Sequence, residues 1–203
     1  MGYTTCFIGD ITSDREFSEP FIKYINDFNR IRHMKRDIEE IKRKDPKWME
    51  HCFDGDLGPE GAFYVGNSGY LTTSKVDCDK IGVVDYNKPP AGCPGLWCDW
   101  KIDERDKQAI EWDGAEKFYS YTEWMVYIIE NFCKPAGYVL NGEIFWEGED
   151  PDDKGKIKVV DNVVKECLGT VVYDDDEDVI EQGLRMCSQE QLEAEVKRRF
   201  LTI

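Results

Sequence analysis

The sequence predicts an α+β protein with a mainly antiparallel sheet and two to three helices packed on it. Three observations support this prediction. Apolar residues recur at helical spacing in separate stretches of the chain. Between those stretches lie several short runs of strand character, some joined by turns too short for a parallel crossover. Strands grouped between helices favour an α+β sheet, whereas a doubly wound sheet alternates strand with helix.

The N-terminal third predicts a short strand followed by one long helix. Residues 3–8 form the expected strand. Ser18 suits the N-cap of a helix, and Glu19-Pro20 suits its first turn. We expect this helix to run to Lys44, because apolar residues recur near helical spacing: Phe21, Ile25, Phe28, Ile31, Ile38 and Ile41. Residues 62–65 are expected to form a second strand.

The middle third predicts a loop, a hairpin and a second helix. Residues 67–95 lack periodicity, and irregular stretches of this length are usually functional or mobile. Residues 96–102 and 109–112 indicate the paired strands of a hairpin. A helix is expected from Asp113 to about Phe132, with an apolar stripe made by Phe118, Tyr121, Met125, Ile128, Ile129 and Phe132.

The C-terminal third predicts a meander of strands. Residues 138–146 indicate a long strand. Residues 157–160 and 163–167 indicate a hairpin closed by the tight turn Asp161-Asn162. Residues 170–173 are expected to add one more strand.

The organisation predicted from these elements is one domain and a tail. Residues 1–173 are expected to form a single α+β domain. Residues 174–203 are expected to form an acidic linker and a C-terminal helix, because five acids in a row precede the capping pattern of Ser188 and Gln191.

The charge balance bears on the partners of the chain. It contains 26 Lys and Arg against 42 Asp and Glu, a formal net charge of −16. A field of this sign repels nucleic acids and anionic membranes, so we expect neither, and it favours a protein partner with a basic surface. The N-terminus has no export signal, and the eight cysteines include no CxxC pair. Reduced thiols in a cytoplasmic protein are therefore expected, and the oligomeric state is left open.

Seven stretches of the chain together resemble an uncharacterised family of small proteins found in bacteria and their phages. They are GYTT at 2–5, RHMKRD at 32–37, EGAFYVG at 60–66, DYNKPP at 85–90, GLWCDW at 95–100, EWDGAEKFY at 111–119 and LNGEIFWEGE at 140–149. The resemblance covers about residues 1–173. It implies a compact intracellular domain from a bacterium or phage, so the cytoplasm of a bacterial host is the expected location, and it carries no catalytic residues.

A basic segment within the acidic chain is the first candidate binding site. Residues 30–44 contain seven Lys and Arg, among them Arg32 and Arg36. This segment could pair with the acidic turn at 147–153, or it could hold an anionic ligand such as a nucleotide.

Three alternating glutamates form a second candidate site. Glu143, Glu147 and Glu149 share one face of an expected strand and its end. Their mutual repulsion could raise one pKa or attract a cation, and the same face could equally be a solvated side of the sheet. Together with the basic segment, these glutamates suggest a binder of a nucleotide-like anion or a metal-dependent hydrolase.

The sequence contains no complete set of catalytic or metal-binding residues at a recognised spacing. The run Asp150 to Gly155 begins like a calcium loop, but Lys154 occupies a ligand position. The cysteine spacing does not match a zinc site. His33 and His51 are expected on the surface. We therefore expect no metal and no cofactor.

Aromatic side chains suggest a protein-binding surface. Trp97 and Trp100 lie on an expected strand, and Trp124 and Tyr127 lie off the apolar stripe of the expected second helix. Such residues could anchor a partner or pack beneath the long loop. The leading hypothesis is a non-enzymatic binding protein, such as a phage-encoded modulator of a host protein. A structural component of a particle is a third possibility.

Overall fold

The computed structural model describes residues 2–66 and 81–171. The chain divides into two compact units, Met1–Gly169 and Thr170–Ile203, and the first of these contains every element described below. The expected C-terminal helix lies outside the described residues, as do residues 67–80 of the expected 67–95 loop.

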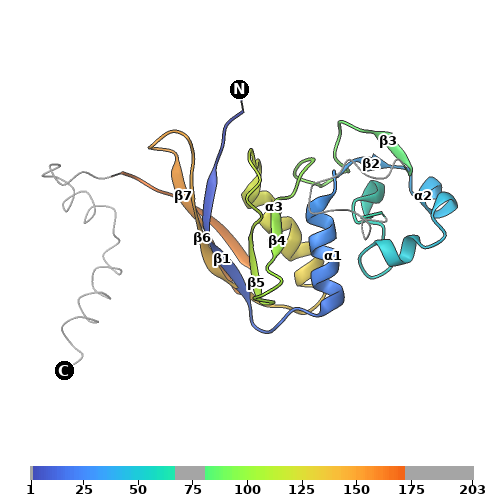
Figure 1. The fold of residues 1–203 in the computed structure, drawn as a ribbon, viewed down its shortest axis with the longest axis horizontal. Coiled ribbons are helices and arrows are strands. Elements are labelled where there is room, and N and C mark those ends of the chain that lie inside the picture. The colour runs from blue at the N-terminus through green and yellow to red at the C-terminus, as the bar shows by residue number, and fades with distance from the viewer. Residues whose placement is uncertain (1, 67–80, 172–203) are drawn as a thin grey trace, which may run out of the picture. The chain divides into compact units, whose positions relative to one another are not determined.

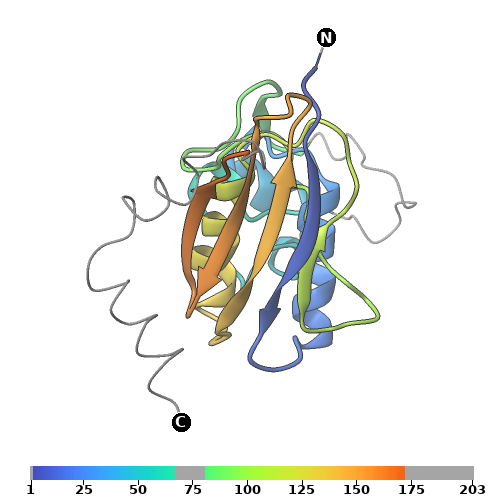
Figure 2. The ribbon, with the colours of Figure 1, turned by 90° about the vertical axis from the view of Figure 1, so that its left-hand side faces the viewer.

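A six-stranded sheet forms the centre of the first unit (Figures 1 and 2). Its order is β4-β5-β1-β6-β7-β8, and every neighbouring pair is antiparallel. The strands are β1 (Cys6–Ser13), β4 (Trp100–Ile102), β5 (Ala109–Trp112), β6 (Leu140–Glu147), β7 (Lys154–Val160) and β8 (Val163–Leu168). A second, two-stranded sheet pairs β2 (Lys35–Arg36) with β3 (Val83–Asp85).

The helices complete the α+β fold that the sequence predicts. They are α1 (Glu19–Arg30), α2 (Ile38–Lys44) and α3 (Tyr121–Ile128), the last continued by a π-helical turn over Ile129–Cys133. Short 3₁₀ turns cover Trp48–His51 and Pro59–Gly61. Figure 2 shows α1 and α3 behind one face of the large sheet. In the described residues, no helix has the length and apolar character needed to cross a membrane.

The core lies between this face of the sheet and the two helices. Alternate strand residues such as Ile11, Ile144 and Ile157 are fully buried, as are Phe28 of α1 and Met125 of α3. Burying one such side chain contributes about 1.5–3 kcal/mol. A second, smaller cluster surrounds α2 and consists of Ile41, Cys52, Leu57 and Tyr64.

The hairpin of β7 and β8 confirms the turn predicted from Asp161-Asn162. Both residues have positive φ, 48° and 66°, as the two-residue turn with matching twist requires. Asn162 tolerates this conformation and also bonds to the backbone at the start of β6. Its side chain accepts from Leu140 N at 2.8 Å and donates to Tyr138 O at 2.8 Å.

The expectation of one helix from Ser18 to Lys44 is wrong. Helix α1 ends at Arg30, because Ile31 is extended and the next backbone groups pair elsewhere. His33 N donates to Leu96 O, and Lys35 N donates to Lys88 O. These tertiary hydrogen bonds outweigh the helical periodicity, and a new helix starts only after Asp37 caps α2.

Three other boundaries also differ from the sequence-based expectations. The second helix begins at Tyr121 rather than Asp113, because Gly114, Lys117 and Ser120 have positive φ. Residues 62–65 follow a 3₁₀ turn and form no strand, although all four are buried. The first strand of the β4–β5 hairpin is shortened to Trp100–Ile102.

Candidate functional site

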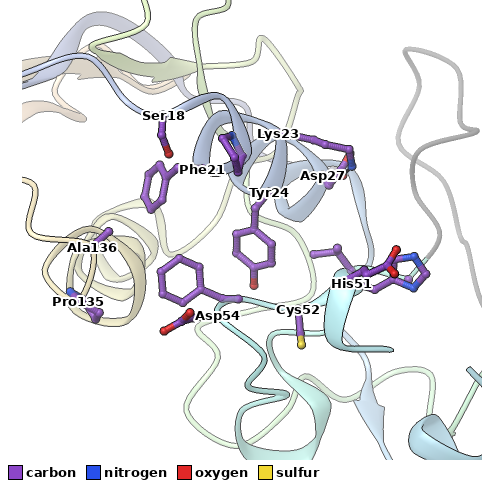
Figure 3. A pocket seen from close by; sticks show the side chains of 15 residues that line it. Ser18, Phe21, Lys23, Tyr24, Asp27, His51, Cys52, Asp54, Pro135 and Ala136 are labelled. Carbon is purple, nitrogen blue, oxygen red and sulfur yellow. Dashed lines mark hydrogen bonds and ion pairs between the residues drawn. The ribbon is translucent and has the colours of Figure 1, made fainter. Parts of the chain in front are cut away.

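A pocket of about 670 Å³ opens beside α1. Its walls come from α1, from the turn and loop at 50–54, and from Pro135 and Ala136 after the π-helical turn. Figure 3 shows Phe21 and Tyr24 extending from α1 toward the loop that carries Cys52 and Asp54. His51 lies at the end of the pocket remote from Pro135.

One wall of the pocket is aromatic. The ring centroids of Phe21 and Phe53 are 6.1 Å apart, and those of Tyr24 and Phe53 are 5.4 Å apart. The Tyr24 hydroxyl donates to Phe63 O at 3.0 Å. Burial raises the pKa of Tyr24 well above its usual value, so this side chain is a neutral phenol at physiological pH.

The polar lining of the pocket is acidic. Asp27, Glu50 and Asp54 contribute carboxylates against one ammonium, from Lys23. Asp27 is 5% exposed and accepts from Lys23, with Arg30 3.9 Å away. Glu50 and Asp54 are exposed. Since opposite charges attract more strongly at a partly desolvated site, this lining favours a cation over an anion.

The thiol in the pocket, that of Cys52, has low reactivity as a nucleophile. Cys52 donates to Met49 O at 3.5 Å, and burial raises the pKa of the thiol to about 11. The thiolate is the reactive form of cysteine, so this side chain acts as a small apolar wall and not as a nucleophile.

A hydrogen-bonded network adjoins the pocket through His51. His51 Nδ1 donates to Asp45 Oδ2 at 2.7 Å, and the Tyr64 hydroxyl donates to the same oxygen at 2.9 Å. Lys47 N donates to Asp45 Oδ1 at 2.9 Å. Burial opposes ionisation of Asp45, but these hydrogen bonds favour the carboxylate more strongly, so its pKa lies below the usual value.

The two arginines predicted to hold an anion support neighbouring loops. The Arg32 guanidinium lies 4.4 Å from the Tyr86 ring and donates to Tyr86 O and to Asn87 Oδ1. Arg36 is buried and donates to Ile81 O at 2.6 Å. Both lie in the extended segment between α1 and α2, and neither lines the pocket beside α1.

The three predicted glutamates bind basic and backbone groups of the protein itself. Glu143 accepts from Lys156 and lies 3.2 Å from Lys158, and these lysines lower its pKa rather than raise it. Glu147 pairs with Lys154 at 3.5 Å, and Glu149 accepts from Thr4 N at 2.8 Å.

The structure does not bring the arginines and the glutamates together. Figure 1 places β2 and β6 on opposite sides of the first unit. The single site suggested for anion binding and hydrolysis is therefore not formed by these residues.

Three of the four predicted partner anchors are core residues. Trp100 and Trp124 are 0% exposed and Tyr127 is 8% exposed, whereas Trp97 is half-buried. The position of Trp124 and Tyr127 off the apolar stripe of α3 does not expose them, because both rings pack against Phe28 of α1. Trp100 Nε1 donates to Tyr121 O at 2.9 Å.

Both histidines are placed differently from the sequence-based expectation. His33 is 2% exposed and packs against Phe28, with ring centroids 4.1 Å apart. The His51 side chain is 19% exposed and bound to Asp45. The pair Asp45-Pro46, which ends a helix a few residues before His51, is the one signal in the sequence that the chain changes direction there. The sequence does not show that the chain turns back so that His51 reaches Asp45.

The described residues contain no group of three or more His, Cys, Asp or Glu that could hold a metal ion. No family model matches the chain, and no curated protein and no solved structure is similar to it.

Proposed function

We propose that the protein is a non-enzymatic binding protein that holds a positively charged organic group in the pocket beside α1. The observation that supports this most is the combination of an aromatic wall with three carboxylates and one ammonium. Rings attract cations through their faces, and carboxylates pair with amidinium and ammonium groups. The volume of about 670 Å³ lies within the range of small-ligand sites.

The cation has two possible sources, a free organic amine or amidine and a Lys or Arg side chain on a partner protein. The second source fits the strong net charge of −16, which attracts basic surfaces. It also fits the hypothesis of a phage-encoded modulator of a host protein in the bacterial cytoplasm. The protonated Cys52 thiol supports binding over covalent chemistry.

A matched ligand series tests the charge preference. Benzamidine, benzamide and benzoate have nearly the same shape and carry charges of plus one, zero and minus one. Isothermal titration is expected to give the order benzamidine, then benzamide, with benzoate weakest. Equal affinities, or tighter binding of benzoate, would overturn the proposal.

A double variant tests the carboxylates. Glu50→Gln with Asp54→Asn is expected to weaken benzamidine binding about two- to tenfold, since each partly exposed pair contributes about 0.2–1 kcal/mol. The affinity for benzamide should change little. The matched control is Glu116→Gln with Asp152→Asn, two exposed carboxylates outside the pocket lining, which should leave both affinities unchanged.

The same titration distinguishes the two sources. A short arginine peptide with neutral flanking residues is expected to bind more weakly than benzamidine if the natural ligand is a free aromatic cation. A peptide that binds more tightly indicates a protein partner. If neither probe binds, the pocket is not a cation site.

A further inference from the structure

The Asp45–His51–Tyr64 network opens on a second hollow, distinct from the pocket beside α1. This hollow has a volume of about 330 Å³ and is bounded by Lys44, Lys47, His51 and Ile81, with Asp45 and Tyr64 in its wall. It lies at the end of α2, where the chain turns into the 3₁₀ helix Trp48–His51.

The second ring nitrogen of His51 is available to a ligand. Because Nδ1 donates to a carboxylate, neutral His51 keeps its lone pair on Nε2. Among the residues that the structure describes, the His51 ring forms its hydrogen bond with Asp45, and that contact uses Nδ1. Neutral Nε2 accepts a hydrogen bond, and the protonated ring donates one from the same position.

The orientation of this ring is fixed from within the protein. Asp45 is held by Lys47 N and by the Tyr64 hydroxyl as well as by His51. Tyr64 is 1% exposed and belongs to the small core around α2. The Arg36 guanidinium lies 5.3 Å from its ring centroid. A buried carboxylate that accepts from an imidazole fixes the orientation of the ring.

The lining of the hollow itself carries more positive than negative groups. Lys44 and Lys47 line it, and Asp45 is the carboxylate in its wall. Two further carboxylates face these lysines from outside the lining, since Glu40 pairs with Lys44 and Glu50 lies 3.7 Å from Lys47. An entering dianion would compete with these two exposed pairs, which are individually weak.

We propose that this hollow is a binding site for a phosphate-bearing small molecule, in which His51 Nε2 and the ammonium groups of Lys44 and Lys47 hold the phosphate oxygens. Hydrogen bonds from charged donors to phosphate are among the strong ones, and an imidazolium whose Nδ1 is held by a carboxylate donates from Nε2 in a defined direction. The hollow differs from the pocket beside α1 in most of its lining, although His51 borders both.

Proton NMR of the two histidines tests the site directly. The chain has only His33 and His51, so their ring signals separate readily, and buried His33 serves as an internal reference. Inorganic phosphate is added at constant pH and ionic strength. A saturable shift of the His51 signals with little change at His33 is expected.

Three variants separate binding from general charge effects. Lys47→Ala is expected to weaken phosphate binding at least threefold. Lys165→Ala replaces an exposed lysine of β8 and should leave phosphate binding unchanged. His51→Asn retains an amide donor where Nδ1 stands and lacks Nε2. This variant should keep the fold and lose most phosphate binding. Because it has no His51 signal, isothermal titration measures its affinity for phosphate.

Several results would overturn the inference. They are the absence of a saturable shift, an equal loss in Lys47→Ala and Lys165→Ala, and full phosphate affinity in a folded His51→Asn variant. Loss of phosphate binding with retention of benzamidine binding would leave the cation pocket intact, so the two proposals fail separately.

Discussion

Asp45 is the residue on which the local structure around both pockets depends. Its backbone N donates to Ile41 O at the C-cap of α2, and its carboxylate accepts from Lys47 N and joins Tyr64 to His51. This one residue therefore connects a helix end, a buried tyrosine and the 3₁₀ turn that borders both hollows.

Replacing Asp45 by Asn is expected to destabilise the fold by about 1–3 kcal/mol, because buried donors lose a charged acceptor. The pKa of Asp45 is depressed in the folded protein, so its contribution is present above the usual carboxyl pKa of about 4 and is lost as the pH falls below it. Urea unfolding at several pH values measures this.

The same unfolding series contains its own control. Asp152→Asn alters an exposed carboxylate in the β6–β7 turn and should leave the acid dependence as in the unchanged protein. If Asp45→Asn and the unchanged protein lose stability in parallel below pH 4, Asp45 does not contribute as described.

Residue types alone could not have shown this network. Asp45-Pro46 predicts a stop, and that stop is correct. His51 follows six positions later in a turn-rich stretch, where a surface histidine is the ordinary expectation. The contact depends on a 3₁₀ turn that reverses the chain, and such a turn carries no strong periodicity. The aromatic Phe53 likewise reaches the pocket only through this turn.

At the scale of elements, local signals predicted the strands of the meander better than the helices. The β7–β8 hairpin follows from its two turn residues, and β5 begins and ends where its pattern does. The first helix was overextended because Ile31, Ile38 and Ile41 continue its spacing. Ile31 is buried in the main core, whereas Ile38 and Ile41 pack in a second small core around α2 after an extended break.

The hairpin turn gives a quantitative prediction for Asn162. Asn162→Ala is expected to lower the free energy of unfolding by about 2–3 kcal/mol. It removes two hydrogen bonds and places alanine, which tolerates positive φ less well than asparagine, in the turn. Asn162→Gly keeps the turn conformation and loses only the hydrogen bonds. Chemical denaturation of both variants measures the difference.

The expected difference between these two variants is about 1 kcal/mol, with Ala the less stable, which is the cost of a left-handed non-glycine residue. An Asn162→Ala variant as stable as the unchanged protein would show that neither the turn conformation nor its hydrogen bonds limit the fold.

At the scale of the whole molecule, the acidity of the chain is not spread evenly. Lysines of β7 neutralise the glutamates of β6, so the face expected to carry uncompensated charge is paired. Three carboxylates line the pocket beside α1, and two ammonium groups line the hollow at the end of α2. Net charge could predict a basic partner, but only the folded chain shows where a cation would bind.

The most direct test of the central claim locates bound benzamidine by NMR. Isotope-labelled protein is titrated with benzamidine and, separately, with benzoate, and the difference between the two sets of shifts is mapped on the chain. We expect the largest differences at Phe53, Val65 and Ala136, which line the pocket beside α1. Differences centred elsewhere, for example on the outer face of the sheet around Phe145, would contradict the account.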